Sequence, residues 1–194
     1  MIVHCTQKLS AKLKRAGYRV STTPLASEQF SSGTEQLFGS WHANITTIQR
    51  TQCVVFCHDQ TRFALVMIGA TAKELKAIDY WFSDLLVNTL LKAGVDPALI
   101  EATCQPLSAL QFDTACDRSV QGTLNQLIQE LDWTVQYDGV SITDLPIYST
   151  CVRLSKRPRR IKGMKESECF WPSEAMKQHL LTIGSSLITG VDNG

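Results

Sequence analysis

The stretch 39–59 constrains the fold more than any other part of the chain. Apolar and polar residues alternate over 41–48, which is typical of a β-strand with one buried face. The segment 53–57 is almost continuously apolar, as expected for a central strand buried on both faces. A third run, 62–68, follows after a short turn. These segments predict an antiparallel meander.

Helical patterns surround this meander. Thr71 and Glu74 have the spacing of a capping box, and apolar residues recur at helical spacing from 75 to 90 before Gly94 ends the run. A second amphipathic helix is predicted after the capping residue Asp117. The segment 21–39 has no period and is predicted to be a long loop.

These patterns together predict an α+β fold. We expect an antiparallel sheet meander, joined by strands near Ile2 and Leu107, with amphipathic helices packed on it. The length of 194 residues fits a single α+β domain, which we assign to 1–165. The remainder, 166–194, is predicted to be a C-terminal extension that is partly helical or flexible.

Composition excludes several classes of protein. A hydrophobic content of 44% with 19% charged residues is that of a globular chain, not of a disordered one. No apolar run approaches the roughly 20 residues of a membrane span, so no membrane partner is expected. The number of cysteines, seven, is odd, and no signal-peptide pattern precedes them. We therefore expect free thiols and a cytoplasmic location.

The sequence indicates neither a cofactor nor a metal. It contains no GxGxxG or GxxxxGK motif for dinucleotides or phosphates. Cys53 and Cys57 lie four residues apart on a predicted strand, so they would be about 13 Å apart, too far for one zinc site. Their apolar neighbours favour unreactive core thiols.

Three residues of the first meander strand are candidates for a site. The period of two places His42 and Asn44 on one face, opposite Trp41. His42 could act as a general acid or base with Asn44 as a neighbouring hydrogen-bond donor. The alternative is that Trp41 lies in the core while His42 and Asn44 fix a loop. His58, followed by Asp59, is a further candidate, although turn chemistry alone also explains the Asp.

A second group of candidates lies on the helix after Asp117. Arg118 and Asn125 are spaced to share its outer face, and Arg118 could bind a phosphate or carboxylate. We hypothesise that His42, Asn44, Arg118 and Asn125 form one pocket. The alternative for Arg118 and Asn125 is a solvated or salt-bridged surface.

A basic segment follows. Between 151 and 165 there are seven basic residues and no acidic one, so this segment carries +7 while the rest of the chain carries −6. Such an asymmetry suggests an anionic partner, either nucleic acid or an acidic protein. Its candidate binding residues are Arg153, Arg157, Arg159, Arg160 and Lys162. The alternative is a solubilising surface, or a segment docked on the acidic body.

Four groups of residues carry a resemblance to a known family. They are Cys5-Thr6-x-Lys8-Leu9, Gly39-x-Trp41-His42-Ala43-Asn44, Cys53-Val54-x-Phe56-x-His58-Asp59-x-Thr61, and Asp117-Arg118-Ser119-Val120-x-Gly122 with Asn125. With these motifs, residues 1–165 resemble an uncharacterised family of small bacterial proteins, a domain of unknown function. The resemblance implies a bacterial cytosolic domain and favours His42, Asn44, Arg118 and Asn125, but it brings no activity.

Three functions are consistent with these features. The first is a non-enzymatic binding module that engages nucleic acid or an acidic partner through segment 153–165. The second is a small enzyme on a phosphate-containing substrate, such as a metal-independent nuclease, with His42 as acid or base and Arg118 stabilising negative charge. The third is an interaction component of a toxin–antitoxin or defence pair. No pattern indicates the oligomeric state.

Overall fold

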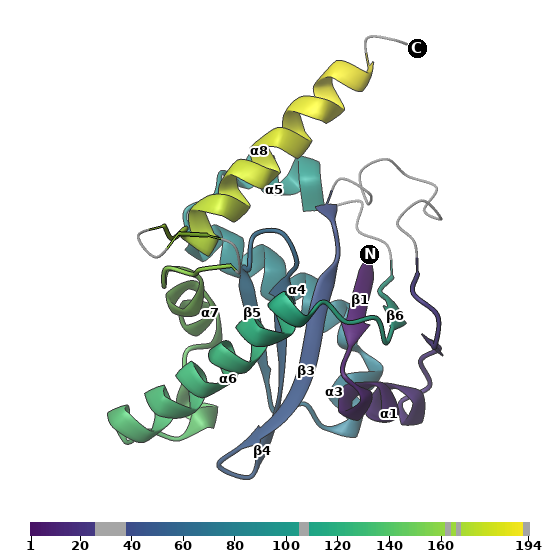
Figure 1. Cartoon of the computed structure of the whole chain (residues 1–194), viewed down its shortest axis with the longest axis vertical. Helices are drawn as coiled ribbons and strands as arrows, with labels where there is room; N and C mark the ends of the chain where they lie inside the picture. Colours follow the sequence, from purple (N-terminus) through teal and green to yellow (C-terminus); the bar gives the residue numbers. More distant parts are fainter. Residues whose placement is uncertain (26–37, 105–108, 162–163, 166–167, 192–194) are drawn as a thin grey trace.

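The computed structural model describes residues 1–25, 38–104, 109–161, 164–165 and 168–191 (Figure 1). The strands are β1 (Ile2–Cys5), β2 (Val20–Ser21), β3 (Trp41–Ile48), β4 (Thr51–His58), β5 (Ala64–Ile68) and β6 (Gln111–Asp113). The α-helices are α1 (Gln7–Arg15), α3 (Ala72–Lys76), α4 (Ile78–Lys92), α5 (Pro97–Cys104), α6 (Arg118–Asp138), α7 (Ile147–Ser155) and α8 (Pro172–Val191), and η2 (Ile142–Asp144) is a 3₁₀ turn. The predicted α+β class is confirmed.

The strands form one mixed sheet in the order β2-β6-β1-β3-β4-β5. The predicted meander is confirmed, because β3, β4 and β5 pair antiparallel. The sheet as a whole is mixed, since β1 pairs in parallel with both β3 and β6, and β2 with β6. Parallel neighbours need long crossover connections, and helices supply part of these here.

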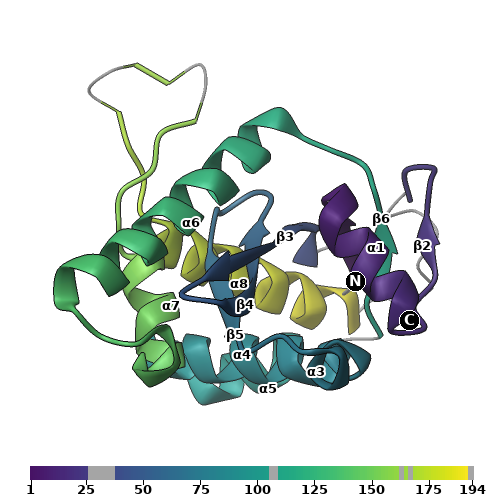
Figure 2. The ribbon, with the colours of Figure 1, turned by 90° about the horizontal axis from the view of Figure 1, so that it is seen from below.

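Helices cover both faces of the sheet (Figure 2). On one face, side chains of α1, α3, α4, α5 and α8 enclose a core that includes Trp41, Phe56 and Phe82. On the other face, α6 and α7 enclose a second core around Val55, Val66 and Leu127. This second face is the one toward which His42 and Asn44 point, since they alternate with Trp41 along β3.

Capping side chains begin three of the helices, and two of these caps, Asp117 and Thr71, were predicted. Thr6 caps α1 by accepting from the backbone N–H of Leu9, and Asp117 caps α6 by accepting from Ser119 and Val120. The hydroxyl of Thr71 donates to the Glu74 carboxylate in the predicted capping box. The single long helix expected after Thr71 is interrupted at Ala77, which lies outside helical geometry and separates α3 from α4.

Helix α7 covers the β5 edge of the sheet. The backbone N–H of Ala64 in β5 donates to the Ser155 hydroxyl at 3.0 Å, and that of Val66 lies 3.2 Å from the Cys151 sulfur. These contacts occupy donors that an exposed edge strand would otherwise present to other chains.

Helix α8 packs on α5, with Met176, Leu180 and Ile183 fully buried in the first core. Among the described helices, none has the length and apolarity to cross a membrane.

Candidate functional site

The parallel register places three polar side chains side by side. His4 of β1 is paired with His42 of β3 on one side and with Asp113 of β6 on the other. Asp59, just after β4, completes the group, which we call the His–Asp row: His4, His42, Asp59 and Asp113. The two imidazole rings lie 4.9 Å apart. The row therefore joins three strands near the first turn of α6.

Both ring nitrogens of His42 are engaged within the protein. Its Nδ1 lies 2.7 Å from Oδ1 of Asp59, to which it donates, and its Nε2 accepts from the backbone N–H of Asp117 at 2.9 Å. The side chain is only 4% exposed. This histidine thus fixes the start of α6 against β3, and neither nitrogen is free to exchange a proton with a substrate.

His4 has the more reactive arrangement. Its Nδ1 donates to Oδ1 of the fully buried Asp113 at 2.6 Å, while its Nε2 lies 3.8 Å from Oδ2 of Asp59. Burial lowers the pKa of His4, but the hydrogen bond to Asp113 and the charges of Asp113 and Asp59 outweigh burial, so the pKa is raised from its usual value. The Nε2 atom is therefore a proton donor held in one orientation.

Asp113 is held as a carboxylate. Burial raises its pKa, but hydrogen bonds from His4 and from the backbone N–H groups of Leu25 and Ala115 reverse that effect, and the pKa is lowered overall. The arrangement of His4 on a buried carboxylate is one that orients imidazole in acid–base catalysis.

Arg62 links the His–Asp row to α6. It is 4% exposed and adopts a left-handed backbone conformation with φ of 58°. Its Nη1 donates to the carbonyl of Asp59, and its Nη2 donates to the Ser119 hydroxyl at 3.2 Å.

In the part of the chain that the structure describes, no group of three or more His, Cys, Asp or Glu side chains is placed to hold a metal.

The four residues hypothesised to share a pocket are placed differently from one another. Arg118 is exposed and directly follows Asp117, which contacts His42. Asn44 lies further along β3, where its Oδ1 accepts from the Thr6 hydroxyl at 2.9 Å. Asn125 is exposed on α6, about 10 Å further along the helix axis than Arg118. The structure thus brings His42 near Arg118, while Asn44 serves the start of α1.

Trp41 and His58 lie on the opposite face of the sheet. Trp41 is fully buried against Phe82, with ring centroids 5.1 Å apart. His58 is also fully buried; its Nε2 donates to the Phe38 carbonyl at 2.8 Å, and its Nδ1 lies 2.8 Å from the Thr61 hydroxyl. Burial lowers the pKa of His58 to about 4. These contacts are those of a packed core.

The cysteines of the sheet are unsuited to nucleophilic chemistry. Burial raises the pKa of Cys53 to about 11 and that of Cys57 to about 12, so the thiolate is not the stable form at neutral pH. Both thiols pack in the core under α6.

The basic segment separates into buried and exposed residues. Arg159 is 5% exposed and donates to both carboxylate oxygens of Glu130 on α6, at 2.5 and 2.8 Å. It also donates to the Leu154 carbonyl near the end of α7. Arg159 therefore fastens the segment to the body of the domain. Arg160 is exposed, and Lys162 lies outside the described residues.

Four cations surround one hollow at the ends of α4 and α7, which we call the basic groove. It has a volume of about 420 Å³. Its lining residues, all of them described, are Lys92, Ser149, Val152, Arg153, Lys156 and Arg157, with no carboxylate among them. Two acids outside the lining lie at the limit of ion-pair distance from groove cations: Arg153 lies 3.8 Å from Asp138, and Arg157 lies 3.9 Å from Glu130. The Arg153–Asp138 pair is exposed and therefore weak, and Glu130 is already bound by Arg159, so the groove stays positive.

A second hollow continues along the same segment, and we call it the Trp133 hollow. It has a volume of about 450 Å³ and is lined by Gln126, Gln129, Glu130, Trp133, Pro158, Arg159, Arg160 and Cys169. Trp133 is 53% exposed, which is unusual for so large an apolar side chain. The segment from Lys156 to Arg160 thus lies between a cationic hollow and an aromatic one.

Comparison with known proteins identifies a family. The model of a family described as a domain of unknown function, DUF6933, matches residues 2–175. The chain belongs to this family. The match covers the sheet, the His–Asp row and the described part of the basic segment, so these features lie within the DUF6933 domain. The predicted resemblance to an uncharacterised family is confirmed. No curated protein and no solved structure matches the chain.

Several residues of this DUF6933 domain that shape the candidate sites were not singled out from the sequence. His4 is a single polar residue in a short apolar run, and its partner Asp113 is 109 residues away. Lys92 follows the usual preference for cations at helix C-termini, so it gives no separate signal. Trp133 did carry a signal, because it falls outside the apolar stripe of α6.

Proposed function

We propose that this DUF6933 domain binds single-stranded nucleic acid through the basic groove and the Trp133 hollow. The observation that carries the proposal is the convergence of four cationic side chains on one hollow without a carboxylate in its lining. Cations gathered in this way attract a polyanion, and phosphate contacts supply most of the affinity for nucleic acid. The proposal retains the expectation of a bacterial cytoplasmic protein.

The aromatic residues favour nucleic acid over an acidic protein. Trp133 is half exposed beside Arg160, and Tyr137, one helical turn further on α6, is 88% exposed. Bases of a single strand stack on such rings, while Arg and Lys contact the backbone. Gln126 and Gln129 in the same hollow have amides that can both donate to and accept from base edges.

The experiment is a fluorescence anisotropy titration of a labelled 12-nucleotide strand, DNA or RNA, with the full chain. The double substitution Lys156→Gln/Arg157→Gln should weaken binding strongly. The matched control, Lys8→Gln/Lys14→Gln, removes the same charge from exposed positions on α1 and should leave binding almost unchanged. Trp133→Ala should weaken binding by about 5- to 150-fold, the range measured for loss of one stacked base.

Three outcomes would contradict the proposal. They are no binding, an equal loss in the groove variant and the α1 control, or affinity independent of Trp133. Binding of an acidic peptide in preference to the oligonucleotide would instead favour a protein partner, including a defence or toxin–antitoxin partner.

A second candidate function rests on a separate observation, the 2.6 Å contact of His4 with buried Asp113. We propose His4, in place of His42, as the general acid or base of a phosphate-substrate enzyme, with exposed Arg118 at the start of α6 available to the substrate. Electrophoresis of the oligonucleotide after incubation tests this. Cleavage that is lost in His4→Gln but retained in His58→Gln would support it, whereas an intact strand would contradict it.

A further inference from the structure

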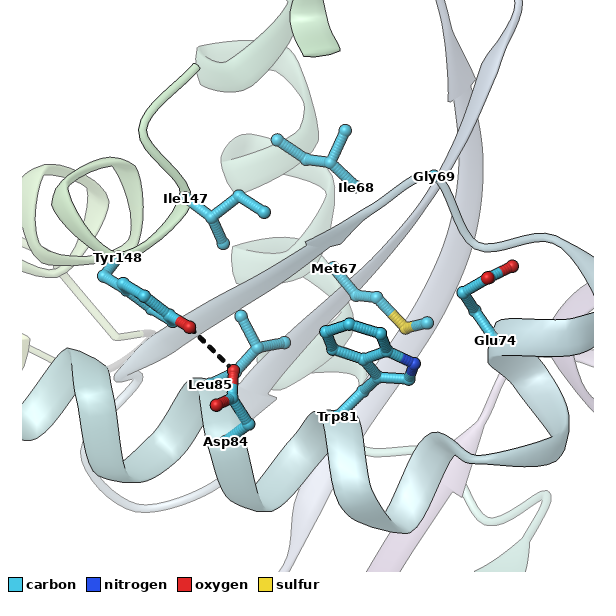
Figure 3. A pocket seen from close by; sticks show the side chains of 9 residues that line it. All are labelled: Met67, Ile68, Gly69, Glu74, Trp81, Asp84, Leu85, Ile147 and Tyr148. Carbon is cyan, nitrogen blue, oxygen red and sulfur yellow. Dashed lines mark hydrogen bonds between the residues drawn. The ribbon is translucent and has the colours of Figure 1, made fainter. Parts of the chain in front are cut away.

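A third cavity lies away from both candidate sites, where α7 begins beside the end of β5. It has a volume of about 270 Å³ and is shown in Figure 3. Its lining residues are Met67, Ile68, Gly69, Glu74, Trp81, Asp84, Leu85, Ile147 and Tyr148. We call it the Trp81 pocket. Its size suits a small organic molecule better than a macromolecule.

The wall of the Trp81 pocket is apolar and aromatic. The indole of Trp81 lies beside the Met67 side chain, and Ile68 and Ile147 lie across the space from them (Figure 3). The ring of Tyr148 lies at one end of the pocket. Trp81 is partly exposed and lines the pocket, so its indole is accessible to a ligand there.

The charged groups of the pocket are all acidic. Glu74 and Asp84 belong to the lining, while no Lys, Arg or His does, and the structure describes every lining residue. Asp84 accepts from the Tyr148 hydroxyl at 2.8 Å and from the Asn88 amide at 3.0 Å. Glu74 accepts from the Thr71 hydroxyl. Neutral donors therefore orient both carboxylates, and among the described side chains no cation forms an ion pair with either.

A ligand for this pocket must match an apolar wall, an electron-rich ring and two negative charges. An anion such as a fatty acid would be repelled by Glu74 and Asp84. A neutral apolar molecule would leave the two carboxylates without a positive charge beside them. A cation with an apolar body satisfies both, because the face of an indole attracts ammonium groups and the carboxylates add to that attraction.

We propose that the Trp81 pocket binds an organic ammonium ion, either a quaternary ammonium or a protonated primary amine, on an apolar body. Trp81 contacts the cation through its ring face, and Asp84 supplies the neighbouring negative charge. Met67, Leu85 and Ile147 contact the apolar part. This site is independent of the basic groove, whose charge is opposite.

The experiment compares choline with 3,3-dimethylbutan-1-ol, which has nearly the same shape but no charge. Both are titrated into the full-length protein while the indole N–H NMR signal of Trp81, assigned with Trp81→Phe, is followed. Choline should shift this signal and bind at least about fivefold more tightly than the alcohol, as expected for a cation over an indole. Asp84→Asn should reduce the preference for choline. Trp81→Leu, which lacks the indole signal and is titrated by calorimetry instead, should abolish it.

Two controls keep the test decisive. Trp133→Leu removes an exposed tryptophan from another surface and should leave choline binding unchanged. Circular dichroism tests whether each variant is folded. If Trp81→Leu is not, Asp84→Asn and Glu74→Gln, which change polar lining residues, carry the test. Equal binding of the two probes, or a preference for choline that survives Asp84→Asn and Glu74→Gln together, would overturn the proposal.

Discussion

The buried histidine at the end of β4 gives a quantitative prediction about acid stability. His58 donates through Nε2 to Phe38, and its Nδ1 is occupied by Thr61, so a second proton would have to replace a hydrogen bond inside the core. Burial accordingly lowers the pKa of His58 from an ordinary value of 6.5 to about 4. We therefore expect the free energy of unfolding to fall as the pH is lowered.

The sign and size of the effect follow from proton linkage. Below about pH 6.5 the unfolded chain binds a proton on His58, whereas the folded chain remains neutral there until about pH 4. The stability contributed by the neutral histidine is thus complete above pH 6.5 and is lost progressively down to pH 4. A pKa difference of this size corresponds to about 3 kcal/mol, since one unit is worth about 1.4 kcal/mol.

Urea unfolding at about pH 7.5, 5.5 and 4 measures this loss in wild type and in His58→Gln. Glutamine keeps a donor for Phe38 but does not titrate, so its stability curve should be flatter than that of wild type by about 3 kcal/mol over the range. His179→Gln, which alters a partly buried neighbour 5.2 Å from the His58 ring, is the control and should retain the steep dependence. Parallel curves for wild type and His58→Gln would refute the reasoning.

Three further predictions concern other parts of the fold. Arg159→Ala should lower the free energy of unfolding by about 3–5 kcal/mol, because it leaves Glu130 without its buried partner. The control, Arg160→Ala, should change the free energy of unfolding by less than about 0.5 kcal/mol. Similar urea midpoints for the two variants would contradict this prediction. Gly122→Ala should stabilise the protein by about 1 kcal/mol and raise Tm by about 2–4 °C, since an added Cβ meets nothing within 4 Å; a lower Tm would argue against it. His4 contributes stability that is present below its unfolded pKa and is lost as the pH rises through its raised folded pKa. The free energies of unfolding of His4→Gln and wild type should therefore differ more at about pH 6 than at about pH 9. The opposite trend in urea titrations would show that the pair with Asp113 does not form.

The meander and its helices could be predicted because their signals are local. The alternation along β3 and the apolar run in β4 are read within eight residues each, and the caps Thr6 and Asp117 lie beside the helices they begin. The parallel pairing of β1 could not be read in this way. It depends on which crossover connections the whole chain can form, and no residue of β1 specifies its neighbours.

The same distinction explains what was predicted of the candidate sites. His42 was identified because it belongs to a patterned strand, whereas its partner His4 becomes a neighbour only through the register of β1 with β3. The basic segment was visible as a charge run, but burial separates Arg159 from Arg160, and burial is a property of the fold. Lys92 lines the basic groove from α4, far from the basic segment in sequence.

The most direct test of the proposed function is the salt dependence of oligonucleotide binding. Each phosphate neutralised on a single strand contributes about 0.7 to the slope of log K against log salt, so engagement of all four groove cations predicts a slope near −3. Lys92→Gln should reduce its magnitude by about 0.7, and Lys8→Gln on α1 should not change it. A slope near zero, or one that Lys92→Gln leaves unchanged, would contradict binding in the basic groove.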